Sequence, residues 1–96
     1  MNPDGIQTND DRTGLIRVIE RFPEDREALQ RLFRGSGSFQ SLCDDYGDCL
    51  AGLKNWEQST AKEAPTMRGA YADLLQELEQ EVRQYLKVEA DPEFWR

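Results

Sequence analysis

Large apolar residues recur at intervals of one and three positions from Phe39 to Trp56, a rhythm typical of one face of a helix. At about 100° per residue they fall within an arc of about 140°. The members of this stripe are Phe39, Leu42, Cys43, Tyr46, Cys49, Leu50, Leu53 and Trp56. The segment from about 39 to 59 is therefore predicted to be an amphipathic helix whose apolar face the rest of the chain covers.

A second stripe of similar width follows Pro65 and predicts another long helix, from about 64 to 87. Its members are Met67, Tyr71, Leu74, Leu75, Leu78, Val82, Tyr85 and Leu86. Because only a short connection separates the two long helices, they are expected to fold back on each other as an antiparallel hairpin. Pro92 is expected to end the second of them.

Two shorter stripes precede the hairpin, on either side of Pro23, and predict helices over about 13–21 and 24–34. The first stripe consists of Leu15, Ile16, Ile19 and Phe22, and the second of Ala28, Leu29, Leu32 and Phe33. Gly35 is predicted to follow the second helix as its C′ residue, and Ser38 is predicted to cap the long helix that comes next.

These elements predict an all-α fold in which two short N-terminal helices pack across a long helical hairpin, similar to a four-helix bundle. Residues 12–88 are expected to form a single domain. Residues 1–11 are polar and are expected to be a disordered leader, and residues 89–96 are expected to be a tail.

Gly47 and Gly52 lie inside the first long helix, where each glycine costs about 1 kcal/mol relative to alanine. Two interpretations are open. Either the glycines allow another backbone to come close, or they occupy exposed positions where the residue type matters little.

The formal net charge of −7 argues against nucleic-acid binding, which needs clustered lysine and arginine for phosphate contacts. Residues 12–34 contain six arginines against four carboxylates, whereas residues 35–96 contain six basic and twelve acidic groups. The basic first third is therefore expected to face the acidic remainder or a partner.

The sequence shows no signal peptide and no apolar run of the ~18 residues that span a membrane, so a soluble cytoplasmic protein is expected.

Cys43 and Cys49 are six residues apart on one predicted helix, so their Cα atoms are separated by about 9 Å along its axis. A disulfide needs Cα atoms within about 7 Å, and the two residues are therefore not expected to bridge. A zinc site is not expected either, because two thiols so placed do not converge and the chain has no histidine. Both are interpreted as buried core residues; a redox-sensitive thiol and a bridge between two copies are the alternatives.

Asp44 and Asp48 are four positions apart and share a helix face, as do Glu77 and Glu81 on the second long helix. Carboxylates from two helices could ligate a hard cation. Asp44 and Asp48 point away from the apolar stripe, however, so they are interpreted as a solvated acidic face. No metal and no cofactor is predicted.

Asp73, Glu77 and Glu81 form a ladder of like charges along one edge of the second long helix. Each like-charge step costs roughly a few tenths of a kcal/mol in an isolated helix, so cations are expected beside the ladder. The arginines available on the two short helices are Arg17, Arg21, Arg31 and Arg34. We predict that the short helices dock on this ladder; a basic partner protein and plain solvation of the carboxylates are the alternatives.

Two further features bear on function. Phe94 and Trp95 follow Pro92 and are expected either to fold back on the hairpin or to anchor a partner.

For catalysis, the chain has no histidine to serve as a base for a serine or cysteine nucleophile, and no glycine motif that binds phosphate. We predict that the chain is not an enzyme.

The motif F-x-x-L-C-x-D-Y-x-x-C-L from Phe39 to Leu50, with Y-x-x-L-L-x-E-L-E from Tyr71 to Glu79, resembles a group of short bacterial proteins of unassigned role. The resemblance covers about half of the chain. It implies a bacterial, cytoplasmic, helical protein, and it carries over neither an activity nor a functional residue.

The sequence thus predicts a small acidic helical module for protein–protein interaction, which self-associates through surface that the hairpin leaves uncovered. One alternative is a regulatory protein that responds to a ligand or a divalent cation on an acidic helix edge. Another is an acidic decoy that occupies a basic, nucleic-acid-binding surface of a different protein. The candidate interaction residues are Asp73, Glu77, Glu81, Phe94, Trp95, Arg17 and Arg21.

Overall fold

The structure is a computed structural model, and it describes residues 13–91. Those residues form helices and the turns between them, with no strand. Residues 13–21 form the first helical segment, and a 3-10 turn at Pro23–Asp25 follows it. The remaining helices are α2 (Arg26–Gly35), α3 (Gly37–Glu57) and α4 (Ala64–Ala90). The all-α class and the order of helices predicted from the sequence are confirmed.

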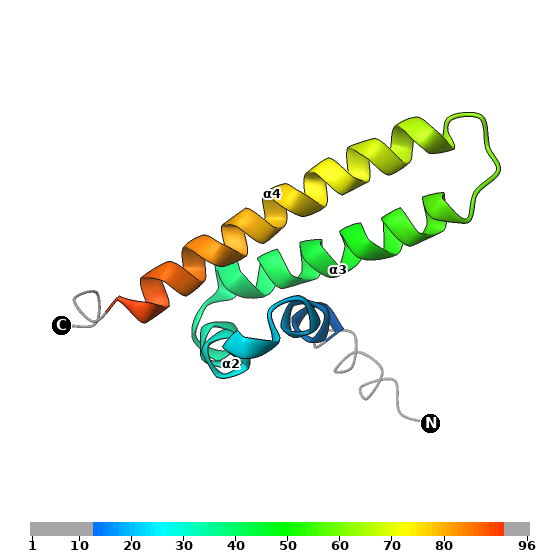
Figure 1. Ribbon diagram of the computed structural model, residues 1–96. Coiled ribbons are helices and arrows are strands. Elements are labelled where there is room, and N and C mark those ends of the chain that lie inside the picture. Colours follow the sequence, from blue (N-terminus) through cyan, green and yellow to red (C-terminus); the bar gives the residue numbers. More distant parts are fainter. Residues whose placement is uncertain (1–12, 92–96) are drawn as a thin grey trace, which may run out of the picture.

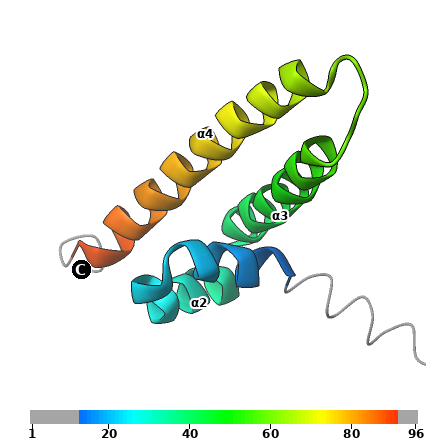
Figure 2. The same cartoon turned by 45° about the vertical axis from the view of Figure 1, so that its right-hand side comes forward.

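The long helices α3 and α4 run antiparallel, side by side, and form the predicted hairpin (Figure 1). The first helical segment and α2 pack across one end of this hairpin, near the start of α3 and the end of α4 (Figures 1 and 2). The other end of the hairpin, with the loop between α3 and α4, projects beyond the short helices. The short helices therefore cover only part of the two long stripes.

The hydrophobic core lies at the covered end of the hairpin. Its fully buried side chains include Val18 from the first helical segment, Leu29 from α2 and Val82 from α4. The buried residues of α3 all precede its last two turns; they are Phe39, Leu42, Cys43, Tyr46 and Cys49. Fully burying a large apolar side chain contributes about 1.5–3 kcal/mol, so this end holds the short helices in place.

Two glycines allow the first helical segment to cross α3 at very short range. A Cβ atom at Gly14 would collide with the main-chain carbonyl of Cys43, and a Cβ atom at Gly47 would lie 3.2 Å from the Cα atom of Gly14. In the same way, a Cβ atom at Gly52 would collide with the ring of Tyr71 in α4. The close approach of another backbone is confirmed at Gly47, whereas at Gly52 the neighbour is a side chain, the Tyr71 ring. Gly14 was not identified from the sequence.

The junction between α2 and α3 differs from the prediction. Ser36, rather than Ser38, caps α3: its backbone is extended, and its Oγ accepts a hydrogen bond from the Phe39 N–H at 3.1 Å. The Ser38 hydroxyl is instead hydrogen-bonded to the Tyr85 hydroxyl of α4 at 2.6 Å. Gly35 is the last residue of α2, and no described glycine has a positive φ. The predicted C′ role of Gly35 is wrong, because the extended Ser36 turns the chain without a left-handed residue.

α4 continues to Ala90, three residues past its predicted end, and Asp91 is extended with φ −80° and ψ 111°. A residue that precedes proline is disfavoured in the helical conformation, so Pro92 accounts for the stop. The leader predicted for residues 1–11 and the aromatic residues Phe94 and Trp95 lie outside the described residues. Among the helices of residues 13–91, none combines the length and the apolar character that crossing a membrane requires.

Candidate functional site

The arginines of the short helices reach α4, but at carboxylates other than those predicted. The Arg21 Nε donates to Glu79 Oε2 at 3.1 Å, and the Arg31 Nε donates to Glu89 Oε2 at 2.6 Å. Arg17 pairs with Glu20 of its own helical segment at 3.1 Å. The short helices therefore pair with α4 at Glu79 and Glu89, and the prediction that they dock on the Asp73 ladder is wrong.

The ladder lies on the opposite edge of the α4 stripe from Glu79. Glu77 precedes the buried Leu78 by one position and Glu79 follows it, so at about 100° per residue the two carboxylates flank Leu78 on opposite sides. The stripe alone does not specify which side the short helices cover. In the structure Asp73, Glu77 and Glu81 are exposed and form no ion pair with any residue between 13 and 91.

Glu79 joins three helices through one largely buried carboxylate, whose side chain is 12% exposed. It accepts from Arg21, lies 3.9 Å from Arg83 Nη2, and accepts from the Tyr46 hydroxyl of α3 at 3.1 Å. The ring of Phe22 packs beneath both guanidinium groups, with centroid distances of 5.0 Å to Arg21 and 5.5 Å to Arg83. This cluster fixes the side of α4 on which the first helical segment packs.

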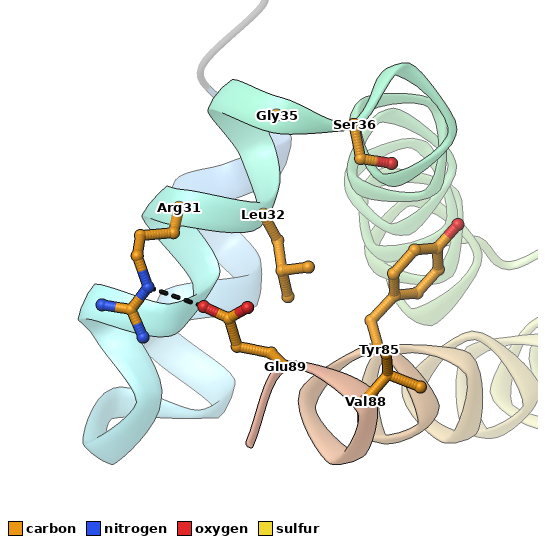
Figure 3. Close-up of a pocket in the computed structure, with 7 residues that line it drawn as sticks. All are labelled: Arg31, Leu32, Gly35, Ser36, Tyr85, Val88 and Glu89. Carbon is orange, nitrogen blue, oxygen red and sulfur yellow. Dashed lines mark hydrogen bonds and ion pairs between the residues drawn. The ribbon is translucent and has the colours of Figure 1, made fainter. Parts of the chain in front are cut away.

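A groove opens between α2 and the last turns of α4, with a volume of about 600 Å³ (Figure 3). We call it the α2–α4 groove; it is lined by Arg31, Leu32, Gly35, Ser36, Tyr85, Val88 and Glu89. The ion pair between Arg31 and Glu89 closes one side, while Leu32, Tyr85 and Val88 supply apolar surface (Figure 3). Val88 is 43% exposed. The volume falls within the range of ligand-binding clefts, about 300–1,000 Å³.

A second hollow, of about 310 Å³, lies between α3 and α4. We call it the α3–α4 hollow; it is lined by Asp45, Asp48, Cys49, Tyr71, Leu74 and Leu78. Leu74 is 44% exposed, and Glu77 and Glu81 follow it by three and seven positions on the same side of α4. Carboxylates of both long helices therefore border apolar surface.

The acidic face predicted on α3 is found, because Asp44, Asp45 and Asp48 are all exposed. Within residues 13–91, no group of three or more acidic or cysteine side chains converges in a way that could hold a metal ion.

Cys43 and Cys49 are free and buried, with exposed fractions of 0% and 3%. Burial raises the pKa of the Cys43 thiol to about 12, and the charge of Asp44 adds to the effect. Burial also raises the pKa of the Cys49 thiol, which donates to the Tyr71 carbonyl at 3.3 Å. Because the thiolate is the reactive form, these protonated thiols are poor nucleophiles. Their interpretation as core residues is confirmed.

No protein-family model, curated protein or solved structure matches the chain. The resemblance to short bacterial proteins, the cytoplasmic location and the expectation that the chain is not an enzyme therefore stay predictions.

Sequence reasoning missed the α2–α4 groove and the roles of Glu79 and Glu89. Two signals were available. Glu79 is directly adjacent to Leu78 in the stripe, so it lies at the edge of the core. Val88 and Glu89 follow the predicted helix end without an intervening proline or glycine, which favours a longer α4 that reaches α2.

Proposed function

We propose that the chain is a small acidic module for protein–protein interaction, and that it self-associates through the uncovered end of its hairpin. The supporting observation is the position of the core at the opposite end. Beyond the short helices the two stripes continue with Leu53, Trp56 and Met67, which are only partly buried. After Cys49 in α3 and before Leu78 in α4, the only buried apolar residue among those described is Ala64.

A second copy is a suitable cover for this surface. A chain of 96 residues buries a smaller fraction of its surface than a larger domain does, and its stability margin is correspondingly thin. Two hairpins that pack their uncovered ends together would make a four-helix arrangement, in which each stripe faces two neighbours. A closed pair of this kind uses the same surface on both copies.

The predicted self-association is tested by measuring mass with light scattering over a range of protein concentrations. We expect the mass to rise above the 11.1 kDa of one chain as concentration increases. Replacing Leu74 with glutamate should weaken association by about tenfold or more, because a carboxylate would be buried among apolar side chains. Ile16→Glu is the control, since Ile16 is also exposed (50%) but lies on the first helical segment. A strict monomer at millimolar concentration would contradict self-association.

A partner with basic and apolar side chains is favoured by the α3–α4 hollow. Asp45 and Asp48 on one helix, and Glu77 and Glu81 on the other, form no ion pair within residues 13–91, and they flank the exposed Leu74. An amphipathic helix that carries leucine on one side and lysine beside it would match both properties. Exposed ion pairs contribute about 0–1 kcal/mol each, so the carboxylates would select the partner and its orientation.

Binding of a basic partner is tested by fluorescence anisotropy with a labelled lysine–leucine amphipathic peptide, and with a scrambled peptide of the same composition as control. We expect Asp45→Asn with Asp48→Asn to weaken binding by about threefold to tenfold at low salt. Glu24→Gln with Glu27→Gln removes equal charge from the 3-10 turn and the first turn of α2, which do not line the hollow, and should have little effect.

Salt distinguishes the two kinds of association. Added salt should weaken binding of the lysine–leucine peptide, because it screens the attraction between opposite charges. It should strengthen self-association, because it screens the repulsion between acidic copies. Equal binding of the scrambled peptide would contradict a specific basic partner.

A further inference from the structure

We propose that the α2–α4 groove is the docking site of the chain's own segment 92–96, with Trp95 as its anchor. The groove is lined by the last turns of α4, close to Asp91, the last described residue before this segment. Leu32, Tyr85 and Val88 make its apolar surface. This surface is incompletely covered, because Val88 is 43% exposed.

The segment is long enough to reach the groove. Val88 and Tyr85 precede Asp91 by three and six positions, which correspond to about 4.5 and 9 Å along the helix axis. An extended chain covers about 3.3 Å per residue, so Trp95 can lie up to about 13 Å from Asp91. Asp91 is already extended, and Pro92 prevents the helix from continuing. The chain can therefore turn back along α4.

The groove also fits an aromatic anchor in size and chemistry. Its volume of about 600 Å³ accommodates an indole ring with part of the neighbouring phenyl ring of Phe94. The Tyr85 ring offers an aromatic contact, and the hydroxyl of Ser36 lies at the edge, where an indole N–H can donate.

Tethering favours the chain's own segment over a free ligand. Only three residues separate Asp91 from Trp95. Such a short link gives an effective concentration in the millimolar range, without the loss of freedom that a separate molecule pays on binding. The proposal is independent of the proposed function, because the groove lies at the covered end of the hairpin and the association surface at the other.

The test uses the fluorescence of Trp95 in the full chain. Trp56→Phe leaves Trp95 as the only tryptophan. We expect its emission in the folded protein to lie at shorter wavelength than in urea, with weaker quenching by acrylamide. Val88→Glu in this background should lower the docked fraction by about tenfold or more, because docking would bury a carboxylate. The control is Ile16→Glu, on the first helical segment with similar exposure, 50% against 43%, which should leave Trp95 unchanged.

A second pair of variants keeps the test valid if Val88→Glu lowers the helix content seen by circular dichroism. A Cβ atom at Gly35 or at Gly37 meets nothing within 4 Å, but only Gly35 lines the groove. Gly35→Gln should therefore expose Trp95, and Gly37→Gln should not.

Three results would overturn the proposal. The first is a Trp95 that is as accessible to acrylamide in the folded protein as in urea. The second is an equal response of the groove variants and their controls. The third is a blue-shifted emission that disappears on dilution, which would mean that the segment docks on a second copy instead.

Discussion

Replacing Gly14 with alanine is expected to lower the free energy of unfolding by about 3 kcal/mol, although it adds a single methyl group. That methyl would have to occupy the space of the Cys43 carbonyl, which belongs to the backbone of α3 and cannot rotate away. The first helical segment would move off α3 and expose Val18, which is fully buried. A protein of this length has a total stability of only about 5–14 kcal/mol, so the loss is a large part of it.

The same substitution at Gly69 is the matched control. Nothing lies within 4 Å of a Cβ atom there, and the residue is exposed in the interior of α4. Alanine should therefore stabilise the protein by up to about 1 kcal/mol, through its higher helix propensity. Urea unfolding followed by circular dichroism measures both variants. If Gly14→Ala were as stable as Gly69→Ala, the close crossing of the first helical segment over α3 would be contradicted.

The sequence was sufficient for the elements of this fold and for their order. Each helix carries an apolar stripe with helical spacing, and Pro23, Pro65 and Pro92 mark boundaries through the local restrictions of proline. The burial of both cysteines also followed from local geometry, because they belong to the stripe. These properties depend on residues close together along the chain, which is why the pattern predicts them.

The parts that failed depend on how separate helices cross. A stripe has two edges, and its pattern does not say that the Glu79 edge, rather than the Glu77 edge, faces the first helical segment. Gly14 could not be singled out either, since a glycine near a helix start has no sequence feature that reports a neighbouring backbone. The α2–α4 groove likewise exists only because α2 crosses the end of α4.

The consequence for the candidate sites is that both hollows combine residues from helices far apart in the sequence. The α3–α4 hollow joins Asp45 and Asp48 to Leu74, and the sequence indicated these as an acidic face and a core residue. Leu74 is 44% exposed and lies beside these carboxylates, so a residue assigned to the core by the pattern borders the acidic face. The proposed interaction surface thus combines residues that the sequence pattern assigned separately to the core and to solvent.

Raising the pH from 9 to 11 is expected to destabilise the protein by about 3 kcal/mol, because two buried groups resist ionisation. Burial is the main reason that the pKa of Cys43 rises from 9.0 to about 12. Burial, followed by the charge and hydrogen bond of Glu79, raises the pKa of Tyr46 from 10.0 to about 12. Above pH 9 the unfolded chain releases these protons while the folded chain keeps them, so stability is intact below pH 9 and falls as the pH rises toward 12.

Urea unfolding at pH 8, 9, 10 and 11, under reducing conditions, measures this dependence. Cys43→Ala leaves a small cavity and lowers stability at every pH. It should nevertheless reduce the slope of the unfolding free energy against pH, above pH 9, by up to about 1.4 kcal/mol per pH unit. Tyr46→Phe should reduce the slope only above pH 10, and the double variant should be nearly flat apart from the smaller contribution of Cys49, whose pKa burial also raises. If Cys43→Ala kept the slope of the unmodified protein, the buried thiol would not be the group that resists ionisation, and the packing of α3 against the first helical segment would have to be looser than the structure shows.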